Sequence, residues 1–166
     1  MYRKVQDFLD NWAYESSATA KVLGNLTDES LGQKVTDDGR SLGFLAWHTV
    51  VTIPDMMGRT GLKIDGPAFE DPMPSTAAEI KQAYEKAAAS LADQISKEWN
   101  DDSLNTEDDM YGENWKKRQS LHNFLTHEIH HRAQMTVLMR QAGLKVPGVY
   151  GPSKEEWANY GMEPMP

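Results

Sequence analysis

Residues 120–143 have the sequence SLHNFLTHEIHHRAQMTVLMRQAG, and this stretch decides the expected fold of the 166-residue chain. At about 100° per residue on an α-helix, one stripe carries most of its apolar side chains together with two polar ones. The stripe consists of Phe124, Glu128, His131, Met135, Leu138 and Ala142, with His127 at its edge. Gly143 is typical of a helix end. The stretch therefore predicts an amphipathic helix over about residues 120–142.

Three earlier segments show the same helical spacing of apolar residues. The first covers about residues 2–26 and the second about 41–60, with Ser41 as a good N-cap. The third covers about 76–99 and opens with the capping-box pattern T-x-x-E at Thr76. Four amphipathic helices can bury their apolar faces only against one another, which favours a bundle.

The segments between and after these helices contain no convincing strand pattern. Residues 100–119 are acidic and rich in Gly and Asn, so we expect a connector with at most a short extended turn. In the tail, one extra helical turn is expected at about 153–158. The sequence thus predicts an all-α protein, a four-helix bundle with long connections, formed by residues 1–166 as a single domain.

Composition excludes several classes of function. The chain has 17 Lys+Arg against 25 Asp+Glu, a formal net charge of −8, and no basic cluster, which argues against binding to nucleic acid or to anionic lipid. It has no cysteine, so any metal must be held by His, Asp or Glu. No apolar run approaches the roughly 20 residues of a membrane span, and the N-terminus does not resemble a signal peptide. We therefore expect a cytoplasmic protein.

Three of the five histidines are candidate metal ligands. His127 and His131 are one helical turn apart on the inward side, whereas His122 and His130 fall on the opposite side. His48 faces inward from the second helix, and a bundle that places this helix beside the fourth would bring the three imidazoles together. Three histidines with room for a further ligand can hold zinc, nickel, iron or manganese. The alternative is that buried histidines are held by ordinary hydrogen bonds.

Two carboxylates are candidates for assisting such a site. Glu128 lies on the inward stripe of the fourth helix, and Asp55 lies two turns after His48 on the same helix face. Either could orient an imidazole or act as a general base. The alternative for Glu128 is a buried ion pair with an arginine such as Arg132. The alternative for Asp55 is to satisfy backbone groups freed by the neighbouring proline.

Two motifs resemble the DinB/YfiT-like superfamily of metal-binding four-helix-bundle proteins. GRSLGFLAWHTV is similar to the family's second-helix motif, and HEIHHRAQMTVLMRQAG is similar to its fourth-helix HxxxH signature. The resemblance implies a non-standard helix order, a homodimer, and His48, His127 and His131 as ligands of one divalent metal. Members with assigned activities are mostly transferases or isomerases that use a low-molecular-weight thiol.

Several functions follow as expectations from these residues and from the resemblance. The leading one is a metal-dependent S-transferase of the detoxification or stress-response type, acting on a small-molecule substrate with a small thiol as cosubstrate. Because a bound metal also activates water, a metal-dependent hydrolase is the second. A non-catalytic metal- or ligand-binding stress protein is the third, and a purely structural bundle is the fourth.

Overall fold

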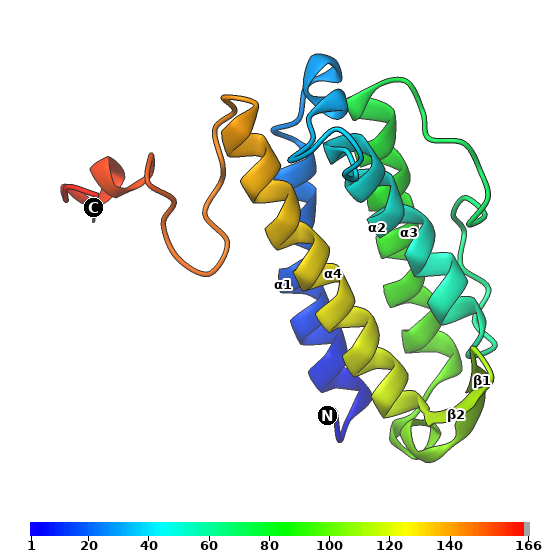
Figure 1. Cartoon of the computed structure of the whole chain (residues 1–166). Coiled ribbons are helices and arrows are strands. Elements are labelled where there is room, and N and C mark those ends of the chain that lie inside the picture. Colours follow the sequence, from blue (N-terminus) through cyan, green and yellow to red (C-terminus); the bar gives the residue numbers. More distant parts are fainter. Residues whose placement is uncertain (165–166) are drawn as a thin grey trace.

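Four long α-helices lie side by side and form the body of the protein (Figure 1). The structure is a computed structural model that describes residues 1–164. Its main helices are α1 (Val5–Leu23), α2 (Leu42–Gly58), α3 (Ala77–Glu98) and α4 (Lys117–Gln141). The predicted four-helix bundle is confirmed. Within the described residues, no helix is both long and apolar enough to cross a membrane.

The helices do not follow one another around the bundle in chain order. Both α1 and α2 pack against α3 and α4, so the order around the bundle is α1, α3, α2, α4. The two connections that cross the bundle carry short 3₁₀ helices, η1 (Asp28–Gly32) and η2 (Asp101–Asn105). This order places α2 beside α4, as the convergence of the candidate histidines requires.

The core is made by large side chains from all four helices. Phe8, Trp12, Ile53, Tyr84 and Phe124 are almost completely buried. The Trp12 indole also donates a hydrogen bond of 3.0 Å from Nε1 to the carbonyl oxygen of Ala88, which links α1 to α3. Burial of side chains of this size supplies most of the driving force for the bundle.

A β-hairpin precedes α4, and the sequence did not predict it. Strand β1 (Glu107–Met110) pairs in antiparallel fashion with β2 (Glu113–Lys116). The two turn residues, Tyr111 and Gly112, have φ angles of 61° and 89°, the positive values that a tight type I′ turn requires. Strand β1 is acidic and both strands are only four residues long, so an alternation of apolar and polar residues could not be recognised.

The start of α4 is also corrected, to Lys117 instead of a position near Ser120. The Lys117 amide donates to the carbonyl oxygen of Thr106, and its ammonium lies 2.6 Å from an Asp108 carboxylate oxygen. Lys117 is therefore held by the hairpin and the helix at once, and the helix begins as soon as β2 ends.

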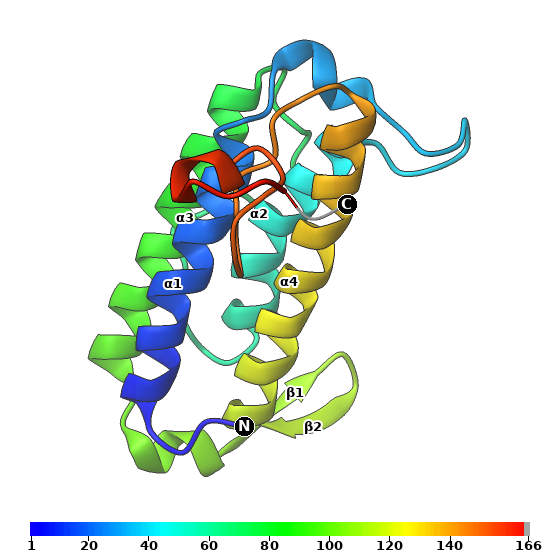
Figure 2. The same ribbon diagram turned by 90° about the vertical axis from the view of Figure 1, so that its left-hand side faces the viewer.

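The C-terminal segment leaves the bundle after α4 (Figures 1 and 2). Gly143 ends the helix region with a φ of 74°, as its sequence position predicted. The extra turn is η3 (Trp157–Tyr160), a few residues later than the expected position at 153–158. Between them, the Tyr150 hydroxyl returns to the bundle and contacts Glu15.

Candidate metal centre

The side chains of His48, His127 and His131 meet at the interface between α2 and α4. The Nε2 atom of His127 lies 3.3 Å from Nε2 of His48 and 3.1 Å from Nε2 of His131. One ligand atom from each residue lies within 4.8 Å of the others. Two donors come from successive turns of α4 and the third comes from α2, because these helices are neighbours. The structure thus brings together all three histidines that the sequence singled out.

The other two histidines do not join this cluster. His122 and His130 are exposed, which agrees with their helical phase. His130 stacks edge-on against His131 at 5.1 Å between ring centroids, but it is absent from the group of converging donors. The helical phase therefore separated ligand candidates from solvated histidines correctly.

The surroundings of the three imidazoles favour their neutral form. The pKa of His48 is lowered to about 4, mainly by burial and also by the nearby His131 and Arg40. Burial also lowers the pKa of His127 to about 4, with additional effects of His131 and His48. The pKa of His131 is lowered mainly by burial as well. Neutral imidazoles are the form that binds metal ions.

Gln134 orients His131, a role that sequence reasoning did not assign. The Nδ1 atom of His131 lies 2.7 Å from Oε1 of Gln134, three residues later on α4. Because an amide oxygen only accepts, Nδ1 carries the proton and Nε2 presents its lone pair to the other histidines. The i, i+3 spacing on a helix was the available signal.

The donor set fits a metal ion. Two nitrogens at about 2.0–2.1 Å from a tetrahedral ion are separated by roughly 3.3 Å, close to the two measured Nε2 separations. Without a cation or a shared proton, converging lone pairs repel one another and buried imidazole nitrogens stay unpaired. His127 Nδ1, on the other side of the ring, is buried without a hydrogen-bond partner, and a metal ion at Nε2 would not satisfy it.

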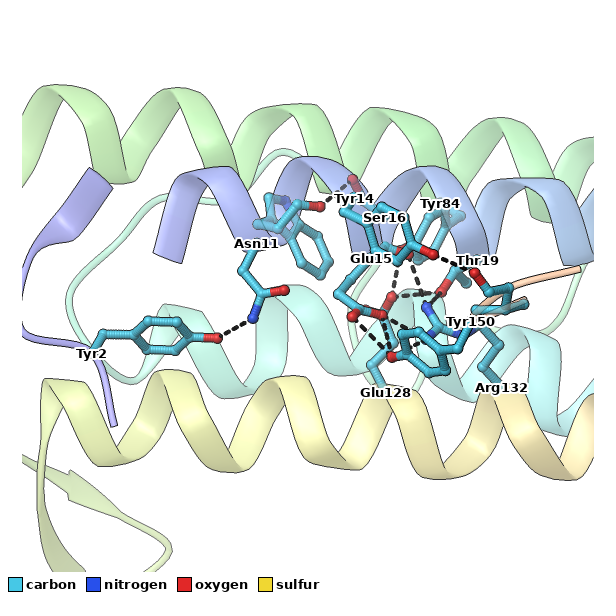
Figure 3. Close-up of polar contacts among 12 residues, drawn as sticks. Tyr2, Asn11, Tyr14, Glu15, Ser16, Thr19, Tyr84, Glu128, Arg132 and Tyr150 are labelled. Carbon is cyan, nitrogen blue, oxygen red and sulfur yellow. Dashed lines mark hydrogen bonds and ion pairs between the residues drawn. The ribbon is translucent and has the colours of Figure 1, made fainter. Parts of the chain in front are cut away.

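Glu128 is not part of the histidine cluster. Its Oε1 atom accepts hydrogen bonds from Thr19 (2.7 Å) and Tyr84 (2.6 Å), and its Oε2 atom is buried without a partner (Figure 3). Burial raises the pKa of Glu128 to about 7, although both hydrogen bonds lower it. Glu128 therefore serves the contact of α4 with α1 and α3, and within the described residues it makes no hydrogen bond to a histidine.

Arg132 forms a buried ion pair with Glu15 and not with Glu128, so the alternative role of Glu128 as its partner is wrong. Arg132 Nη2 lies 2.5 Å from Glu15 Oε2, and both side chains are almost fully buried. Arg132 also donates to Thr19 Oγ1, which in turn donates to Glu128. Tyr150 donates its hydroxyl to Glu15, so the tail covers this polar cluster (Figure 3).

Asp55 also contacts other residues than the histidines. It accepts a hydrogen bond of 2.6 Å from the Tyr111 hydroxyl in the hairpin turn and one of 3.2 Å from Arg59. Its negative charge nevertheless acts on His48, whose pKa it raises against the dominant effect of burial. Asp55 connects the hairpin to α2 and influences His48 through its charge alone.

Two aromatic side chains lie against His48, and helical phase places one of them, Phe44, on the same face of α2. Phe44 stacks on it with a centroid distance of 5.8 Å, and Phe69 meets it edge-on at 6.1 Å. Both are about half exposed, at 44% and 49%. They form an apolar rim beside the converging nitrogens. Phe44 is four residues before His48, and at this spacing two side chains lie on the same face of a helix.

The helix order, the histidine cluster and the family comparison together define the class of protein. The model of the DinB family matches residues 1–165, and the chain belongs to this family. An uncharacterized protein of Bacillus subtilis strain 168, YrdA, is 42% identical over 163 residues, which is 98% of each chain.

Two solved structures of DinB-like proteins have the same fold. A DinB-like protein from Bacillus cereus ATCC 10987 superposes with a TM-score of 0.87 at 43% identity, covering 90% of this chain and all of the other. The DinB-like protein YjoA from Bacillus subtilis, at 15% identity, shares the fold with a TM-score of 0.69 and covers 86% of this chain and 97% of that one.

Proposed function

We propose that this protein binds one divalent transition metal ion through His48, His127 and His131, and uses it in reactions of a small-molecule thiol. The observation that carries the proposal is the convergence of three Nε2 atoms, two of them 3.1 and 3.3 Å from a third. Among the described residues, Asp55 and Glu128 do not belong to this donor group. Three protein donors leave a coordination position for a substrate, as is typical of catalytic sites.

The chemistry of such a site depends on what reaches it. A bound divalent ion supplies a Lewis acid that lowers the pKa of a coordinated thiol or water. The three histidines are neutral and leave the charge of the ion uncompensated, while Gln134 holds His131 with its lone pair toward the ion. The chain has no cysteine, so a thiol nucleophile must be a small molecule.

A metal-dependent hydrolase is the alternative function, because a metal ion in the same donor set would also activate water. A homodimer and a role in detoxification or stress response remain predictions from the family resemblance, and a cytoplasmic location remains a prediction from the sequence pattern. Non-catalytic metal or ligand binding remains the third reading.

Metal binding is tested first, on protein purified without a histidine tag and stripped with a chelator. Isothermal titration with Zn²⁺, Ni²⁺, Mn²⁺ and Fe²⁺ should give one site per chain for at least one ion. His131→Ala and His48→Ala should weaken that binding by at least 100-fold. His130→Ala is the matched control and should stay within about twofold of the unchanged protein. No saturable binding of any of these ions, together with no rise in thermal midpoint, would reject the proposal.

Activity is tested with the metal-loaded protein and an electrophile such as 1-chloro-2,4-dinitrobenzene. Turnover that requires glutathione, bacillithiol or mycothiol supports the transferase, whereas ester hydrolysis without any thiol supports the hydrolase. If neither reaction is found and metal still binds, the result supports a non-catalytic metal- or ligand-binding protein.

A further inference from the structure

A cavity of about 380 Å³ lies next to the candidate metal centre, between the loop that precedes α2 and the C-terminal half of α4. Its size is in the range of small-molecule sites. Most of its lining is apolar, and the polar exceptions are Arg40 and Gln134. The lining residues are Val35, Gly39, Arg40, Leu45, Gln134, Val137 and Leu138. Through Gln134, the cavity shares a wall residue with the site, because this side chain also bonds to His131.

Two of the apolar side chains that line this cavity are exposed to solvent. Val137 on α4 is 54% exposed and Val35 in the loop is 65% exposed. Both side chains line the same cavity, although they come from two separate chain segments. A ligand with an apolar body would remove both from water.

The charge of the cavity is set by Arg40. Among residues 1–164, no carboxylate lies within ion-pair distance of this guanidinium, and only seven of the 17 Lys and Arg side chains have such a partner. Its contact is with the ring of Phe44, 5.0 Å from the centroid, and Phe44 stacks on His48. Arg40 is thus held near the site by an aromatic face, with its N–H donors unpaired.

Arg40 is the only charged residue in the lining of the cavity, and its charge is positive. A cation placed beside neutral imidazoles creates a positive potential at the cavity. An anionic ligand complements this potential, and a guanidinium binds a carboxylate through two parallel hydrogen bonds.

We infer that this cavity binds a small molecule with an apolar body and a carboxylate, the body lying on Leu45, Val137 and Leu138 and the carboxylate on Arg40. This inference names a substrate class for the proposed function, whose site it adjoins through Gln134. The binding itself needs none of the three histidines. The two proposals can therefore fail separately.

The test uses metal-free protein and a matched pair of probes, 4-phenylbutyrate and its uncharged analogue 4-phenylbutanamide. Saturable shifts of the methyl signals of Val137 and Leu138 in a ¹H–¹³C NMR titration report binding at this cavity. We expect 4-phenylbutyrate to bind about tenfold more tightly than the amide, the effect of one charge-assisted contact.

Two variants separate the charge from the apolar surface. Arg40→Gln should bring the affinity for 4-phenylbutyrate down to that for the amide and leave the amide unchanged. Val137→Asp, at an exposed position, should weaken both probes at least fivefold. Arg3→Gln, an exposed arginine elsewhere in the chain, is the matched control and should change neither. Circular dichroism confirms that each variant is folded.

The inference is overturned if 4-phenylbutyrate and the amide bind equally well, if Arg40→Gln leaves the preference intact, or if neither probe shifts the two methyl groups. Failure of the metal titration with retained, Arg40-dependent probe binding would reject the metal proposal and leave the cavity as a ligand site. Metal binding without probe binding would do the reverse.

Discussion

Gln134 gives the candidate site its orientation at the level of a single residue. Its Oε1 atom fixes the proton of His131 on Nδ1. We expect Gln134→Leu to weaken metal binding about 10- to 100-fold, because the imidazole loses the partner that holds its lone pair in place. Gln134→Glu keeps the acceptor and should bind metal at least as tightly as the unchanged protein. Isothermal titration measures both, and equal affinity of the Leu variant would show that Gln134 does not position His131.

The raised pKa of Glu128 predicts how the free energy of unfolding depends on pH. Because its pKa in the folded protein is raised from 4.5 to about 7, the folded state binds more protons than the unfolded state between these values. This contribution to stability is therefore complete below about pH 4.5 and is lost as the pH rises through 7.

Glu128→Gln removes this titration and keeps an oxygen for Thr19 and Tyr84. Urea unfolding should show the Gln variant gaining about 2–3 kcal/mol relative to the unchanged protein between pH 5 and pH 8. The histidines titrate equally in both proteins, so their effect cancels in the difference. A constant difference at the two pH values would mean that Glu128 is ionised throughout.

The single residues of the site were predictable to different degrees. Helical phase was enough to predict that the side chains of His127, His131 and Glu128 point into the bundle. It could not say which neighbouring helix each would meet, because residues one position apart on a helix point about 100° apart. His127 consequently faces α2, whereas Glu128 faces α1 and α3.

The helix α2 provides a test at the level of elements. Gly43 is packed so closely that an added Cβ atom would lie 3.0 Å from the Leu31 carbonyl oxygen in η1. Gly43→Ala should destabilise the protein by about 1–3 kcal/mol, since backbone must move to admit the methyl group. Gly58, at the end of the same helix, has open space around its Cβ position and an ordinary φ angle.

Gly58→Ala is thus the matched control for Gly43→Ala. It should be neutral or stabilise the protein by about 0.5–1 kcal/mol, because alanine restricts the unfolded chain more than glycine does. Thermal unfolding of the two variants gives the comparison. Equal effects of both substitutions would contradict close packing between α2 and η1.

Among the elements, the four helices were predictable and the hairpin was not. Apolar residues recur along the helices over five or more turns, and this long repeat placed them within a few residues of their limits. The hairpin strands have four residues each, and only Met110 among them is buried. Its turn uses Tyr111, where Asn or Asp would have given the usual hairpin signal.

For the whole molecule, the Glu15–Arg132 pair joins α1 to α4. Arg132→Met alone should cost about 3–5 kcal/mol, because it leaves a buried carboxylate without its counter-charge. The double variant Glu15→Leu/Arg132→Met should recover most of this loss. Denaturant unfolding of the single and double variants measures the coupling. Strictly additive losses would show that the two side chains are independent.

The arrangement of the whole molecule was the part least accessible to residue patterns. Amphipathic spacing shows that four helices share a core, but it does not order them around that core. The family resemblance implied a non-standard order, and the structure has α2 between α3 and α4. The buried partner of Arg132 was also beyond reach, because Glu15 lies 117 residues earlier in the chain.

The position of His48 in the chain has a kinetic consequence. His127 and His131 share one helix, but His48 precedes His127 by 79 residues and joins them only after α2 has docked on α4. If the proposed metal ion is held by all three histidines, it therefore contributes little to the first encounters of the folding chain. Once bound, the ion must lose His48 before these two helices can separate. We accordingly expect metal to lengthen the lifetime of the native protein while the refolding rate stays close to that of the metal-free chain.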